Sequence, residues 1–261
     1  MKKPVYWALA LAAVFAIAAL IVHQSRTLPP EPQAVPEPPA ALPAPQAKAE
    51  PQIRYPLEVE AQPLPALDQS DEAARARIAE LVGEPSLVEL LNLQTFVRRV
   101  VATVDNLPRK KLAPRLMPVK PASGHFLTAK QDETLVLSEK NYARYSPYVR
   151  LLDAVDTGKL VAFYTGFYPL FQKAYEDLGY PGAYFNDRLV EVIDDLLAAP
   201  RVDGPIRLVR PKIYYLFADA ELEALSAGQK ILVRIGPENA AKTKAKLHEI
   251  RSALVSRAPD R

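Results

Sequence analysis

Four acidic residues at helical spacing are the first group with the chemistry for catalysis. They are Asp187, Glu191, Asp194 and Asp195, spaced i, i+4, i+7 and i+8. A helix would place these carboxylates on one face, where paired carboxylates act as general acid and base, including on sugar polymers, or bind a divalent cation. A glycosidase, however, needs carboxylates that face each other across a cleft. A solvated helix face explains the pattern equally well, and we prefer that interpretation.

Residues for other catalytic chemistry are scarce. The chain has no cysteine, which excludes disulfides, zinc–cysteine sites, iron–sulfur clusters and thiol nucleophiles. His125 lies beside a proline-rich loop that could display a general base, but no serine motif accompanies it, and an ordinary loop histidine fits as well. No glycine-rich nucleotide-binding motif and no nucleophile elbow occurs. We therefore expect no cofactor, no metal and no catalytic residue, and the formal net charge of only +3 argues against nucleic acid.

Arginines and tyrosines are better suited to binding a protein partner, since both are enriched at interaction hot spots. One group crowds the end of an otherwise apolar helix, where it could also simply cap and solvate that helix. The other lies off the apolar stripe of an aromatic-rich region, and we expect it to be exposed. The two groups are Arg98, Arg99, Asp105, Asn106 and Arg109, and Tyr168, Tyr180 and Tyr184.

The N-terminal residues predict a membrane anchor. Residues 5–22 carry no charge, and as a helix they would be about 27 Å long, close to the roughly 30 Å core of a bilayer. Lys2 and Lys3 precede this stretch, which places residues 1–4 in the cytoplasm and the rest across the inner membrane of a Gram-negative bacterium. A cleaved signal peptide is the alternative, but its apolar core would be shorter and followed by a small-residue cleavage site.

Composition divides the remainder of the chain into two parts. Residues 28–66 contain twelve prolines, which remove backbone donors and prevent regular structure. We therefore expect residues 23–66 to be a disordered periplasmic linker. Residues 67–261 are long enough for one sizeable core, and their patterning predicts a mainly α domain with minor β.

Periodicity and capping residues predict the elements of this domain. Short β-type runs around residues 131–133 indicate a hairpin, and two further strands flank Pro211. The segment 231–233 is either a strand or a buried connector. The predicted helices are 70–83, 86–105 with a capping box at Ser86 and Glu89, two short helices opening at Ser138 and Ser146, 157–179 with a kink at Pro169, one capped by Asn186, 219–225, and a last helix opening at Gly236-Pro237.

Several phrases resemble one known family. They are the stretch Phe96–Pro108 (FVRRVVATVDNLP), the aromatic stretch Phe163–Phe171 and the helix start Gly236–Ala240 (GPENA). Together they resemble the "domain of unknown function 3014" family of proteobacterial membrane-anchored proteins, over most of residues 67–261. The resemblance implies a tethered envelope domain without an established activity, cofactor or catalytic residue.

Two classes of function follow from these observations. The first is a non-catalytic module that binds an envelope protein or a cell-wall polymer, which the tether and the tyrosine-rich region favour. The second is a hydrolase or lyase of an envelope polymer that uses Asp187, Glu191 and Asp194. A deep cleft with facing carboxylates would favour the enzyme, and a shallow aromatic surface would favour binding.

Overall fold

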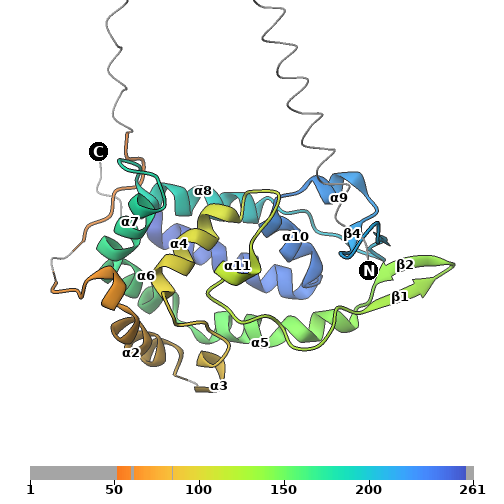
Figure 1. Cartoon of the computed structure of the whole chain (residues 1–261), viewed down its shortest axis with the longest axis horizontal. Helices are drawn as coiled ribbons and strands as arrows, with labels where there is room; N and C mark the ends of the chain where they lie inside the picture. The colour runs from red at the N-terminus through yellow and green to blue at the C-terminus, as the bar shows by residue number, and fades with distance from the viewer. Residues whose placement is uncertain (1–51, 60–61, 84, 257–261) are drawn as a thin grey trace, which may run out of the picture. The chain divides into compact units, whose positions relative to one another are not determined.

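The computed structural model describes residues 52–59, 62–83 and 85–256, except for the side chains of Ser86 and Leu87 (Figure 1). These residues form a mainly helical domain with two small antiparallel sheets, as the sequence predicts. The predicted anchor, residues 5–22, lies outside the described residues. Within the described ranges, no helix has the length and apolar character needed to cross a membrane.

The helices account for most of the domain. Two 3-10 turns, η1 (Leu67–Gln69) and η2 (Pro114–Leu116), accompany them. The helices are α2 (Asp71–Val82), α3 (Pro85–Val88), α4 (Phe96–Asn106), α5 (Lys140–Ala154), α6 (Thr157–Gly166), α7 (Tyr168–Asp177), α8 (Phe185–Leu197), α9 (Ala220–Ala224), α10 (Ala227–Arg234) and α11 (Pro237–Val255).

The main core forms where α4 packs against α2, α7 and α8. Val97, Val101 and Val104 repeat at i, i+4 and i+7 and are all buried, so one apolar stripe of α4 faces inward. Phe171 of α7 stacks on Phe185 of α8, with 6.1 Å between ring centroids. Aromatic rings thus fill the centre of the helical core.

The predicted helix over residues 86–105 is wrong in its first half. Helix α3 ends at Val88, Leu91 forms an isolated bridge with Val119, and α4 begins only at Phe96. The cap of α4 comes from another helix, because Asp71 of α2 accepts the amide hydrogens of Thr95 (2.7 Å) and Phe96 (3.1 Å). A local sequence pattern cannot show such a cap. The predicted Ser86–Glu89 capping box involves a side chain that is not described.

The predicted helix over 157–179 is broken rather than kinked. Helix α6 ends at Gly166, and Phe167, with φ −95° and ψ 2°, separates it from α7. Pro169 lies in the first turn of α7, where its missing donor costs no helical hydrogen bond. Phe167 and Phe171 are nevertheless both buried, so the predicted apolar face survives the break.

Three smaller predictions also need correction. One continuous helix, α5, replaces the two predicted at Ser138 and Ser146, and Pro147 lies inside it. The segment 231–233 is helical and belongs to α10. Asn186 does not cap α8 but lies inside it, fully buried, and donates to the backbone oxygen of Tyr55 at 2.8 Å. Tertiary contacts, rather than local preference, determine these three segments.

Residues 52–59, which we call the strap, lie along α8. Asp187 accepts the amide hydrogens of Arg54 (2.9 Å) and Tyr55 (2.8 Å), and the Tyr184 hydroxyl accepts that of Leu57 (2.9 Å). Tyr55, Leu57 and Val59 also pack against the core. The ordered domain therefore begins before residue 67, the boundary expected from proline content. The prolines prevent regular structure here but not docking onto α8.

The sheets form a second, smaller core. Strands β1 (Thr128–Gln131) and β2 (Thr134–Leu137) make the predicted hairpin. Strands β3 (Leu208–Val209) and β4 (Leu216–Phe217) pair antiparallel and are shorter than predicted. A bridge between Val136 and Arg207 joins the two sheets. Their shared core contains Leu137, Ile206, Leu208, Phe217 and Val233 of α10.

Candidate functional site

A groove of about 440 Å³ lies between α4, α7 and η2. Arg98 and Arg99 reach it from the first turn of α4, because the flanking Val97 and Val101 face the core. Arg115 enters from η2. Apolar groups complete the lining, and they include Leu116, Ala174 and the exposed Leu178. We call this site the arginine groove.

One of the three arginines is neutralised by acids. The Arg98 guanidinium lies between Asp68 (2.9 Å) and Asp177 (3.0 Å). The hydrogen bond with Asp68 is the main cause that raises the pKa of Arg98. Lys173 and Arg98 together lower the pKa of Asp177 through their hydrogen bonds. Arg98 therefore holds η1, α4 and α7 together rather than offering a free charge.

The other two arginines keep an uncompensated charge. The Arg99 guanidinium donates to the backbone oxygens of Gln94 (2.8 Å) and Arg115. Carbonyl groups orient a guanidinium but carry no net negative charge. Arg115 is exposed, and its side chain has no bonded partner among the described residues. The arginine groove thus combines two available cations with an apolar floor.

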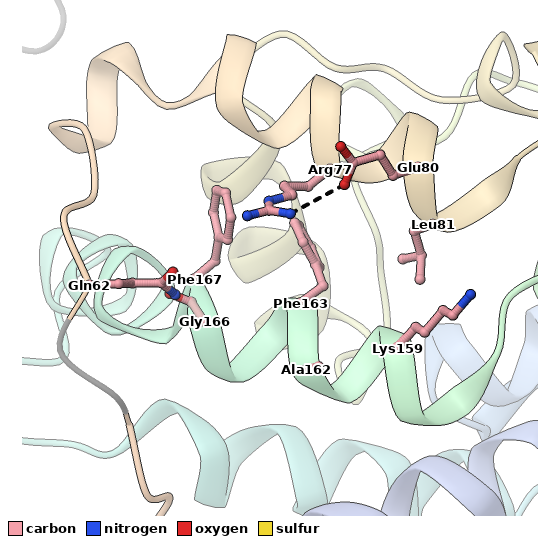
Figure 2. A pocket seen from close by; sticks show the side chains of 9 residues that line it. All are labelled: Gln62, Arg77, Glu80, Leu81, Lys159, Ala162, Phe163, Gly166 and Phe167. Carbon is pink, nitrogen blue, oxygen red and sulfur yellow. Dashed lines mark hydrogen bonds and ion pairs between the residues drawn. The ribbon is translucent and has the colours of Figure 1, made fainter.

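A second hollow of about 440 Å³ lies between α2 and α6. Figure 2 shows Phe163 and Phe167 projecting from the end of α6 toward α2, where Arg77 pairs with Glu80 at 3.2 Å. Gln62 closes one end by donating to the backbone oxygen of Gly166 at 2.7 Å. Its arginine is already paired, which leaves Lys159 as the unpaired cation among the described residues that line it, one fewer than in the arginine groove.

Asp105 is not part of a polar surface, contrary to the prediction. Its carboxylate is 4% exposed and pairs with Arg109 (2.5 Å) and Arg188 (3.3 Å). The Tyr180 hydroxyl donates to the same carboxylate at 3.3 Å, and the charge of Asp105 is the main cause that raises the pKa of Arg109. Asn106 donates to the backbone oxygen of Ala102 within its own helix. This cluster joins α4 to α8 and to the loop after α7.

The tyrosines also differ from the prediction. Tyr168 is only 4% exposed, so its predicted exposure is wrong. Burial raises the pKa of its hydroxyl far above the ordinary range, and this hydroxyl donates to Gln172 at 3.1 Å. Tyr180 and Tyr184 are half-buried, and their hydroxyls bind Asp105 and the strap. The spacing of Tyr168 gave the wrong prediction because the helix breaks at Phe167. Tyr168 therefore does not continue the helical periodicity of α6.

Each acidic residue of α8 binds another segment of the chain. Asp187 binds the strap, and Glu191 pairs with Arg54 and with Arg188 (3.4 Å). Asp194 pairs with Arg251 of α11 at 2.5 Å, and Asp195 accepts the hydroxyl hydrogen of Ser226 at 2.7 Å. The face is solvated at Glu191 and Asp194, which are exposed, but every member also binds another part of the chain.

Acidic and histidine side chains are also the usual protein ligands of metal ions. No group of three or more acidic or histidine side chains in the described part of the chain is arranged to hold a metal ion. His125 lies in the loop before β1 and His248 in α11, and both are exposed.

Comparison with known proteins points to one family. The family model described as "Protein of unknown function (DUF3014)" matches residues 96–251. Neither the search of curated proteins nor the search of solved structures gives a match. Every charged residue that lines the arginine groove falls within the matched range, whereas Arg77 and Glu80 of the second hollow precede it.

Proposed function

The chain belongs to the DUF3014 family, and we propose that it is a membrane-anchored, non-catalytic binding module. Its arginine groove takes an acidic segment of an envelope protein. The observation that carries this proposal is the pair of uncompensated cations, Arg99 and Arg115, over an apolar floor. A carboxylate with a neighbouring apolar side chain complements such a lining.

The size and openness of the groove fit a short peptide segment. Its volume of about 440 Å³ lies within the range of about 300–1,000 Å³ that is typical of ligand sites. Leu178 is 43% exposed beside the cations, so an apolar side chain of the ligand gains contact area there. A neutral sugar polymer would leave both guanidinium charges without a counter-charge, and we therefore favour an acidic protein segment.

The proposed location rests on the N-terminal sequence. Residues 5–22 are uncharged and follow Lys2 and Lys3, which supports a single span with a cytoplasmic N-terminus. The domain would then act in the periplasm. A C-terminally tagged chain should fractionate with membranes at full length and be degraded by protease added to spheroplasts. A soluble mature form that starts after Ala19 would contradict the anchor.

Binding can be tested with a peptide library displayed against the purified full-length chain. We expect the selected peptides to be enriched in Asp or Glu next to an aliphatic residue. Arg115→Glu should weaken a selected peptide at least about tenfold, since a hydrogen bond to a charged group contributes about 1.5–3 kcal/mol. Arg75→Glu is the matched control, because Arg75 is exposed on α2 outside the groove.

Two outcomes would refute the acidic ligand. Either the selected peptides show no enrichment in acidic residues, or Arg115→Glu and Arg75→Glu bind them equally. The hydrolase alternative makes a separate prediction, namely release of soluble fragments from cell-wall polymer by the parent chain and loss of that release in Glu191→Gln. Since Glu191 is bound by Arg54 and Arg188, we expect no such activity.

A further inference from the structure

The loop that joins β3 to β4 carries the two most exposed large apolar side chains of the described chain. Ile213 is 74% exposed and Tyr214 is 79% exposed. Val209, at the end of β3, adds a third at 45%. Single exposed apolar residues are ordinary, but adjacent ones at a hairpin end indicate a contact surface. We call residues 209–214 the hairpin tip.

Charge distinguishes the hairpin tip from an ordinary apolar surface. Residues 204–218 contain Arg207, Arg210 and Lys212 and no acidic residue. All three cations are exposed. Arg207 and Lys212 have no side-chain partner among the described residues, whereas Arg210 donates to the backbone oxygen of Ile213 at 3.3 Å. The tip is therefore basic as well as apolar.

The base of the hairpin tip is firmly packed. Tyr215 stacks on Phe126 with 5.4 Å between ring centroids, and the Arg210 guanidinium lies over the Tyr215 ring, 5.1 Å from its centroid. Phe217 is 2% exposed, and Arg234 lies 4.8 Å from its ring centroid. Ile213 and Tyr214 are thus presented by a fixed support rather than by a loose loop.

We propose that the hairpin tip docks on an anionic lipid surface. Tyrosine rings favour the boundary between headgroups and acyl chains, and an adjacent aliphatic side chain gains apolar burial there. Lysine and arginine attract anionic headgroups, at about fivefold in affinity per charge. The tip itself, residues 209–214, contains no acid, and the flanking Asp203 and Asp219 are occupied by Arg201 and by the amides of α9, which favours an anionic lipid. This contact is separate from the arginine groove.

A fluorescent reporter at the tip tests this proposal in the full-length chain. Trp7 is the only tryptophan, so Trp7→Phe with Tyr214→Trp places one reporter at the tip. The protein is mixed with liposomes of phosphatidylcholine, with or without phosphatidylglycerol, in which the acyl chains are brominated to quench tryptophan. We expect quenching and a blue shift with the anionic lipid only. Trp7→Phe with Leu178→Trp, a reporter in the arginine groove, should show neither.

A charge variant tests the electrostatic part. Lys212→Ala should lower the ratio of docked to undocked tip about fivefold, whereas Lys111→Ala, an exposed lysine elsewhere, should leave it unchanged. Equal quenching of the two reporters, or no effect of Lys212→Ala, would overturn the proposal. A blue shift of the tip reporter that occurs only when envelope protein is added would overturn the proposal in favour of a protein partner. Quenching of Trp7 in the parent chain reports the anchor separately.

Discussion

The substitution Asp187→Asn tests the role that the structure gives to the acidic face of α8. The carboxylate accepts two amide hydrogens of the strap, from Arg54 at 2.9 Å and from Tyr55 at 2.8 Å. An asparagine has one oxygen that can accept and one amino group that cannot. At least one of the two hydrogen bonds is therefore lost, and the negative charge that strengthens the other is lost with it.

The expected cost follows from the energetics of such bonds. A hydrogen bond to a charged group contributes about 1.5–3 kcal/mol. Because Arg54 is exposed and Asp187 only half-buried, we expect the lower end, about 1.5 kcal/mol. Asp187 also lies in the first turn of α8, where a negative charge adds a few tenths of a kcal/mol. The population of the detached strap should then rise about tenfold.

Trypsin provides the assay, because Arg54 lies within the strap and cleavage there requires a detached chain. When opening and closing are fast relative to cleavage, the rate follows the open population, so Asp187→Asn should be cut after Arg54 about tenfold faster. Asp194→Asn is the matched control, since its ion pair with Arg251 does not involve the strap and is exposed, worth about 0–1 kcal/mol. Equal cleavage rates in the two variants would refute the reasoning.

Three further substitutions test the core and its charges by denaturant unfolding. Phe167→Ala should cost about 3–5 kcal/mol, because the ring is 6% exposed, and an unchanged denaturation midpoint would contradict its place in the core. Gly228→Ala should cost about 1–3 kcal/mol, since the added methyl group overlaps the Leu196 side chain, and an unaltered midpoint would mean that Leu196 can move aside. Burial opposes ionisation of Glu223, but hydrogen bonds from Lys230 and a backbone amide still lower its pKa. The stability that Glu223 contributes is therefore present above its ordinary pKa and lost as pH falls through the lowered value, and Glu223→Gln should flatten this acid limb below about pH 4. An acid limb that is identical in the variant would show that Glu223 does not contribute.

The sequence predicts the elements whose information is local. The hairpin at β1 and β2, the helix that ends at Gly83 and the last helix from Pro237 all match, because alternation, a left-handed glycine and an N-terminal proline act within a few residues. The apolar stripe through Val97 and Val101 likewise places α4 in the core. Mainly helical architecture follows from these signals together.

The sequence does not predict contacts between distant segments. Asp71 caps α4 from 24 residues away, and Asp187 binds a strap more than 130 residues earlier. In the sequence both look like ordinary acids near a helix start. Arg99 was a predicted site residue, but Arg115 was not, because a lone arginine in a proline-rich loop has no periodic neighbour. Only the fold shows that the two lie in one groove.

The direction of the strap determines how the domain would respond to mechanical tension. Arg54 contacts Asp187 and Glu191, whereas Leu57 contacts Tyr184 at the other end of this surface, so the strap and α8 run in opposite directions. A pull from the N-terminal side reaches the bonds of Arg54 first and that of Leu57 last. The bonds therefore break one after another, and release of three residues lengthens the chain by about 10 Å before the pull reaches the residues that follow Leu57.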